Sequence, residues 1–184
     1  MSQEIENTAT DFNAQLMHAF ETKGKKKTYA KGEFIIREGE QENNLYLVID
    51  GAVRAYFLSE HEEHTIRLGY NGSFINSLAS FFSRKPSELY IEALRKTEIK
   101  SLKREDLLEI ANRNEKNLMQ YNSMLENLVV QQIERELDLL IDSPSERLER
   151  VLKRSPHVFN YVPLKYIASY LRMKPETLSR IRNS

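Results

Sequence analysis

The chain has 184 residues, 27 basic and 27 acidic side chains, and no cysteine. The lack of cysteine excludes disulfides, thiolate metal sites, cysteine-ligated iron–sulfur clusters and cysteine nucleophiles. No apolar run approaches the roughly 20 residues that cross a bilayer, so we expect a cytoplasmic protein with no membrane partner.

Charge is divided unevenly along the chain. Residues 144–184 carry nine basic and three acidic side chains, whereas residues 1–143 carry 18 basic and 24 acidic ones. A basic end joined to an acidic remainder indicates that the C-terminal part meets a polyanion.

The N-terminal half predicts a short helix followed by an antiparallel β domain. Residues 11–21 place Phe12, Leu16, Ala19 and Phe20 at helical spacing. The lysines of 24–27 indicate a solvated loop. Short β-type runs separated by turn residues then predict a barrel, roll or sandwich. These runs cover 34–37, 44–49, 52–58, 64–70, 87–94 and 98–102, with a short helix expected at 77–82.

After residue 104 the apolar period becomes helical. A short helix is predicted first, then one of about seven turns with an apolar stripe from Leu118 to Leu140. The stripe either packs only on its own β domain or forms the seam of a homodimer. We favour the dimer, because a small β domain cannot cover the whole length.

A helix break at 142–145 predicts the boundary of a C-terminal domain. Ser145 is expected to cap the helix that follows. The predicted domains are residues 1–103 (β domain with its N-terminal helix), 104–143 (linker and dimerisation helix) and 144–184 (C-terminal helical domain).

Two helices joined by a tight turn are predicted near the C-terminus. Ile167, Ala168 and Leu171 form the buried side of the first helix, and Leu178 and Ile181 hold the second inward. A mixture of carboxylate, hydroxyl and cationic groups on the outward side suits base and phosphate contacts in a major groove. The candidate DNA-binding residues are Lys174, Glu176, Thr177, Ser179, Arg180 and Arg182. The alternative is an ordinary surface helix hairpin.

The segment from Tyr166 to Arg182 resembles the helix-turn-helix of the Crp/Fnr superfamily. That family begins its recognition helix with Arg-Glu-Thr-x-x-Arg, and the corresponding residues here are Pro-Glu-Thr-Leu-Ser-Arg at 175–180. Glu176 and Arg180 match base-reading positions, whereas Pro175 replaces the first arginine. Arg172 stands where a turn glycine is frequent, so we expect a strained turn.

Residues 31–40 and 45–54 resemble the front half of a cyclic-nucleotide-binding β-roll. The two resemblances together imply an α+β fold with an N-terminal antiparallel β-roll (double-stranded β-helix, jelly-roll-like), a long dimerisation helix and a C-terminal helix-turn-helix domain. They imply a DNA-binding transcription regulator whose partners are double-stranded DNA, a second copy of the chain, RNA polymerase and an unknown small-molecule effector. The alternative is an effector-binding or protein-interaction β-roll protein with a degenerate DNA-binding end.

The phosphate cassette of the nucleotide-binding relatives is altered in this chain. Its Gly-Glu step reads Gly72-Ser73, and its Arg-Ser step reads Ser87-Glu88, which places a carboxylate where the phosphate would sit. We therefore expect no cyclic AMP bound in the usual way, no cofactor, and either another effector in the same cavity or none. The candidate effector residues are Gly72, Ser73, Phe74, Arg84, Lys85, Ser87 and Tyr121.

An enzyme is the rival class of function. His61 and His64 lie three residues apart in a polar turn, which is more typical of a solvated hairpin tip than of a metal site. The sequence has no phosphate-binding glycine loop, Gly-x-Ser-x-Gly elbow or His-Glu-x-x-His motif. We expect no catalytic residue and no metal ligand.

Overall fold

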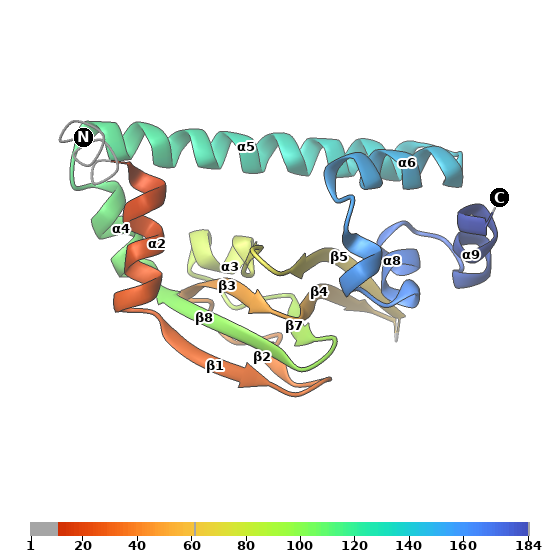
Figure 1. The fold of residues 1–184 in the computed structure, drawn as a ribbon, viewed down its shortest axis with the longest axis horizontal. Helices are drawn as coiled ribbons and strands as arrows, with labels where there is room; N and C mark the ends of the chain where they lie inside the picture. The colour runs from red at the N-terminus through yellow and green to blue at the C-terminus, as the bar shows by residue number, and fades with distance from the viewer. Residues whose placement is uncertain (1–10, 61, 184) are drawn as a thin grey trace.

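The structure is a computed structural model that describes residues 11–60 and 62–183. Two four-stranded antiparallel sheets form a β-roll, with strand orders β1-β8-β3-β6 and β2-β7-β4-β5 (Figure 1). The expected antiparallel roll is confirmed. Its strands are β1 (Lys25–Tyr29), β2 (Phe34–Ile36), β3 (Asn44–Asp50), β4 (Ala52–Ser59), β5 (Glu62–Tyr70), β6 (Phe74–Ile75), β7 (Tyr90–Ala93) and β8 (Thr97–Lys103).

Alternating apolar side chains fill the interior of the roll. Val48, Val53, Ile91 and Ile99 are almost fully buried between the two sheets, as period-2 strands require. The turn between β3 and β4 depends on Gly51, whose φ is +103°. A Cβ there would lie 2.5 Å from Thr97 Oγ1 and 2.7 Å from the Lys96 carbonyl oxygen, so no other residue fits without a shift.

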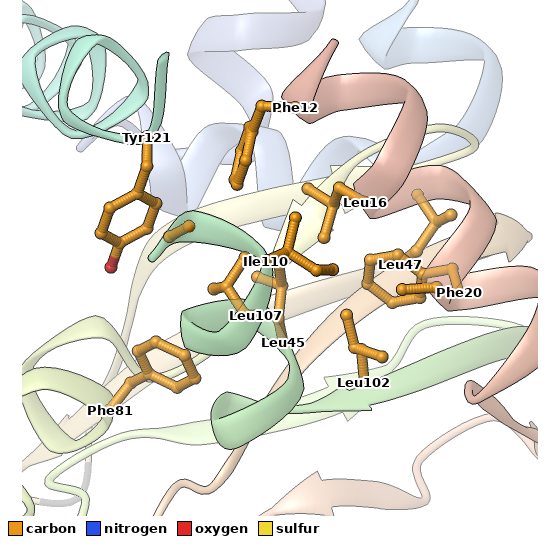
Figure 2. Packing of buried hydrophobic residues seen from close by; sticks show 12 residues of the cluster. Phe12, Leu16, Phe20, Leu45, Leu47, Phe81, Leu102, Leu107, Ile110 and Tyr121 are labelled. Atoms are coloured by element: carbon orange, nitrogen blue, oxygen red, sulfur yellow. The ribbon is translucent and has the colours of Figure 1, made fainter. Parts of the chain in front are cut away.

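Helices close the roll at one end. The elements are α2 (Phe12–Thr22), α3 (Leu78–Ser83), α4 (Arg104–Ala111) and α5 (Glu115–Leu140). Figure 2 shows Phe12, Leu16 and Phe20 of α2 packed with residues of β3, β8, α3, α4 and α5. The four apolar positions predicted to be buried on α2 are buried. This cluster fixes the start of α5 on the roll.

The far end of α5 leads into the C-terminal helices. These are α6 (Pro144–Arg154), α7 (Val158–Tyr161), α8 (Leu164–Tyr170) and α9 (Pro175–Asn183). Their apolar cluster also contains Ala52 and Leu94 of the roll, so this part packs on the end of the roll opposite α2 (Figure 1). Within the described ranges, no helix is both long and apolar enough to cross a membrane.

Three local predictions were wrong. Residues 25–27 form the exposed edge strand β1, paired with β8, because an edge strand tolerates lysines on both faces. The short strand β6 was missed. The cap of α6 is Ser143, which accepts a hydrogen bond from the Glu146 amide at 3.3 Å, because Pro144 takes the first helical position that a proline favours.

Candidate nucleic-acid interface and effector cavity

Helices α8 and α9 meet at a tight turn around Arg172. The φ of Arg172 is +53°, a conformation that costs free energy for a residue with a Cβ. The Met173 amide donates to the Ala168 carbonyl at 3.0 Å, and Ala168 and Leu178 are fully buried between the helices. The strained turn expected from the sequence is confirmed.

Four exposed ionisable groups lie on α9 or directly before it. Lys174, Glu176, Arg180 and Arg182 are exposed, whereas Thr177 and Ser179 are partly buried. A carboxylate accepts from cytosine, and guanidinium groups donate to guanine or to phosphate. The predicted DNA-binding residues therefore lie on α9 or, for Lys174, directly before it, and buried Leu178 holds the helix inward. The guanidinium carbon of Arg182 lies 5.6 Å from the centre of the Phe159 ring.

The junction between α5 and α6 is fixed by a buried carboxylate. Asp138 is fully buried, and its Oδ1 accepts from Arg150 Nε at 2.6 Å. Its Oδ2 accepts from Arg154 Nη2. The two arginines come from α6, so this pair of contacts sets the position of α6 on the end of α5.

Helix α8 docks on strand β5 at the edge of the roll. The Thr65 amide donates to Ser169 Oγ at 3.1 Å, and this hydroxyl donates to the Glu63 carbonyl at 3.3 Å. The rings of Tyr70 and Tyr161 stack nearby with centroids 5.0 Å apart. Helices α7 and α8 are thus joined to the roll by polar and aromatic contacts.

A cavity of about 930 Å³ lies between the roll, α5 and the end of α8. Its apolar wall includes Phe74 and Leu128, and polar side chains of α5 face the same space. The cationic lining residues are Arg67 of β5, Arg135 of α5 and Arg154 of α6. This size and mixed lining are typical of small-molecule sites.

The predicted effector residues are divided between the cavity and its surroundings. Ser73 and Phe74 line the cavity. The other five do not: Gly72, Arg84 and Lys85 are exposed, Ser87 is buried and donates to the Leu89 carbonyl at 2.9 Å, and Tyr121 lies in the apolar cluster of α2 and α4.

Sequence reasoning missed the cationic groups of the cavity, Arg67 and Arg135, and the Tyr170 ring beside them. One signal was available for Arg67, which stands between Ile66 and Leu68 in a predicted strand. No pattern in the sequence places Arg135 and Tyr170 together, because they are 35 residues apart on α5 and α8.

Large apolar side chains are exposed along α5. We define the α5 stripe as Leu118, Met119, Val129, Val130, Ile133, Leu137 and Leu140, each at least 41% exposed. Met124 and Leu125 of the same helix pack on the roll instead. The stripe therefore faces away from the roll.

The histidine-containing hairpin tip and the other potential metal ligands can be compared with the part of the chain that the structure describes. Within it, no three metal-ligating side chains gather in one place. The predicted hairpin tip includes His61, which lies outside the described residues.

Known proteins resemble both the sensor half and the whole fold. Residues 26–114 match the family model of the cyclic nucleotide-binding domain. A search of curated protein sequences gave no significant match.

The fold is shared with solved transcription regulators. FixK2 from Bradyrhizobium japonicum is 22% identical with a TM-score of 0.71, over 87% of this chain and 83% of that one. The catabolite activator protein of Thermus thermophilus is 23% identical with a TM-score of 0.56, over 92% and 81%. A second CRP-family transcriptional regulator of Thermus thermophilus is 18% identical with a TM-score of 0.60, over 85% and 82%.

These likenesses confirm the resemblance to the Crp/Fnr regulators. Residues 26–114 are similar to a cyclic nucleotide-binding domain. At these sequence identities, the solved structures establish the Crp/Fnr fold, in which the roll, a long helix and a C-terminal helical part follow one another.

Proposed function

We propose that the protein is a DNA-binding transcription regulator, not an enzyme, that acts as a homodimer in the cytoplasm. The observation that carries this proposal is the exposure of Glu176, Arg180 and Arg182 on α9 and of Lys174 directly before it, with the helix anchored by buried Leu178. A short helix of this kind in the basic end of the chain has the chemistry to read base edges in a major groove.

The α5 stripe supports the homodimer. Exposed apolar side chains that recur over most of a 26-residue helix favour burial against a second copy of the same helix. Two copies of α9 would then lie on the same side of the pair. Half-sites about 34 Å apart on the duplex are the spacing that such a dimer must match.

We further propose that an effector in the β-roll controls the protein and that cyclic AMP does not bind in the usual way. Ser87 stands at the position where the nucleotide-binding relatives carry an arginine, and its hydroxyl is used in a bond to the Leu89 carbonyl. Arg84 and Lys85 are exposed outside the cavity lining. No guanidinium is therefore supplied by that loop for a cyclic phosphate. RNA polymerase is the further partner that a regulator of this kind implies.

The test is DNA binding by the full chain to genomic fragments, followed by fluorescence anisotropy on the selected duplex. We expect sequence-preferring binding that weakens steeply as salt rises. Arg180→Ala should cost about 1 to 3 kcal/mol of binding free energy and relax base preference. Lys153→Ala is the matched control, since it removes an exposed cation of the basic end outside α9.

An effector-binding or protein-interaction protein with a degenerate DNA-binding end is the second candidate. The arginine that stands at a positive φ where the family often has a glycine and the proline at the start of α9 favour it, because both residues depart from the family pattern. A chain that dimerises but binds no duplex in dilute buffer would support this second function and exclude the first.

A further inference from the structure

Two guanidinium groups in the cavity lack a carboxylate partner among the described residues. The side chain of Arg67 makes no ion pair or hydrogen bond there, and that of Arg135 donates one hydrogen bond, from Nη2 to the Tyr170 carbonyl. The carbon Cζ of Arg135 lies 3.8 Å from the centroid of the Tyr170 ring. Nη1 of Arg135 is buried without a hydrogen-bond acceptor.

The third arginine of the cavity, Arg154, differs from the other two because it has carboxylate partners. Arg154 pairs with Asp138, and its Nε lies 3.7 Å from Glu134 Oε2. Glu134 is the only carboxylate among the lining residues of the cavity that the structure describes. The one carboxylate of the lining therefore pairs with Arg154. No carboxylate among the lining residues pairs with Arg67.

Partial burial of the two unpaired cations is unfavourable by itself. Removal of an ion from water without a counter-charge costs free energy, and burial lowers the pKa of both Arg67 and Arg135. A group that supplies negative charge and accepts hydrogen bonds in the cavity would remove this cost. A planar oxyanion suits a guanidinium best, because it accepts two parallel hydrogen bonds.

We propose that the cavity binds a small organic oxyanion, with its carboxylate or phosphate group held between Arg67 and Arg135. The apolar body of the ligand would pack against Phe74, Met124 and Leu128, and the side-chain amides of α5 would bind its polar substituents. This assignment rests on the proposed function, since it names the chemical class of the effector.

The site differs from a phosphate cassette in where its cations come from. Arg67 belongs to the roll and Arg135 to the far half of α5, and neither lies in the loop between α3 and β7. Arg135 also holds the carbonyl at the end of α8 through Nη2, which leaves Nη1 for the ligand. An oxyanion bound to Nη1 would therefore join the roll to α5 while Nη2 keeps its hydrogen bond to the end of α8.

The experiment measures thermal unfolding and calorimetric binding of the full chain with benzoate, inorganic phosphate and neutral benzamide, at ionic strength held constant with chloride. We expect benzoate or phosphate to raise the unfolding temperature and to bind, and benzamide to do neither. Benzoate alone would assign a carboxylate effector, and phosphate alone would assign a phosphorylated one.

Two variants locate the site. Arg67→Gln and Arg135→Gln should each weaken anion binding about tenfold or more, because a charged hydrogen bond is lost. Arg84→Gln is the matched control, since it removes an exposed cation from the loop outside the cavity lining, and it should bind the anion as the unmodified chain does. Arg67→Gln keeps the contact between Arg135 and Tyr170, so it serves even if Arg135→Gln fails to fold.

The proposal is overturned if neither anion stabilises the chain beyond chloride, if benzamide acts as benzoate does, or if Arg67→Gln binds with unchanged affinity. The samples used for these unfolding and binding measurements contain no DNA. A chain that binds a duplex but no oxyanion would therefore refute the assignment of the effector and leave the regulator function in place.

Discussion

The guanidinium of Arg54, a buried residue of strand β4, lies 4.4 Å from the centre of the Tyr166 ring of α8. The same group lies 4.0 Å from the Tyr56 ring and pairs with Glu63 and Glu92 at 2.5 and 3.3 Å. The guanidinium of a roll residue thus stacks on a ring of α8, the helix that precedes the turn at Arg172.

This stacking predicts a measurable coupling between Arg54 and Tyr166. In a double-mutant cycle with Arg54→Met and Tyr166→Leu, we expect an interaction free energy of about 1 kcal/mol from urea unfolding, because the cation–π contact is shielded from water. The pair Arg54→Met and Phe159→Leu is the control and should be additive. Additivity in the Tyr166 cycle would show that the contact carries no free energy.

Asp138→Asn should loosen the junction of α5 and α6. The substitution removes the buried charge that Arg150 and Arg154 share, and we expect a loss of about 2 kcal/mol in the free energy of unfolding. Glu149→Gln, which disrupts only the exposed pair with Lys153 at 3.1 Å, should change stability by less than about 0.5 kcal/mol. Equal effects of the two substitutions would contradict a special role for Asp138.

Ile133→Glu should convert the dimer to a monomer. The residue lies in the middle of the α5 stripe and is 51% exposed in the single chain, so a carboxylate there would be buried without a partner only in a two-helix seam. Sedimentation measures the outcome. Leu58→Glu, at an exposed apolar position of the roll, is the control and should leave the dimer intact. A dimer that survives Ile133→Glu would place the interface elsewhere.

The buried side chain of Glu42 should make the free energy of unfolding depend on pH. The side chain is fully buried, and its oxygens accept from the Asn44 and Ser77 amides at 3.0 and 3.3 Å. Burial raises the pKa of Glu42 above its ordinary value of 4.5, so the folded chain holds this proton more tightly than the unfolded chain. The stabilisation is complete below pH 4.5 and is lost as the pH rises through the higher pKa of the folded state.

Urea unfolding of the chain and of its Glu42→Gln variant, measured from below pH 4.5 upward, tests this prediction. The free energy of unfolding of the unmodified chain, relative to the variant, should fall as the pH rises, because Gln does not titrate. A difference that stays constant with pH would mean that Glu42 titrates alike in both states.

The elements with strong periodicity could be predicted from the sequence. The apolar spacing of Phe12, Leu16, Ala19 and Phe20 indicated α2 and its buried face, and the stripe from Leu118 to Leu140 indicated α5. Local pattern suffices there, because apolar side chains recur at helical spacing along one face of each helix. The lysines of β1 carry no such pattern, since an edge strand with exposed side chains gains its order from pairing with β8.

The cavity could be predicted only in part. Ser73 and Phe74 were found because they follow the turn that the family resemblance marks, and they line the cavity. Arg67 and Arg135 were missed because each is an ordinary residue of its own element. They share a site only through the packing of α5 on the roll, which brings together residues 68 positions apart.

The hydrogen bond from the Thr65 amide to the Ser169 hydroxyl affects the solubility of the protein. Strand β5 ends its sheet, and the outermost strand of any sheet offers unpaired amides to a passing chain. The Thr65 amide is one of these, and α8 covers it. Any motion that lifts α8 away from β5 would leave the Thr65 amide without its hydrogen-bond acceptor, so a large displacement of the C-terminal helices would expose an unpaired sheet edge and favour aggregation.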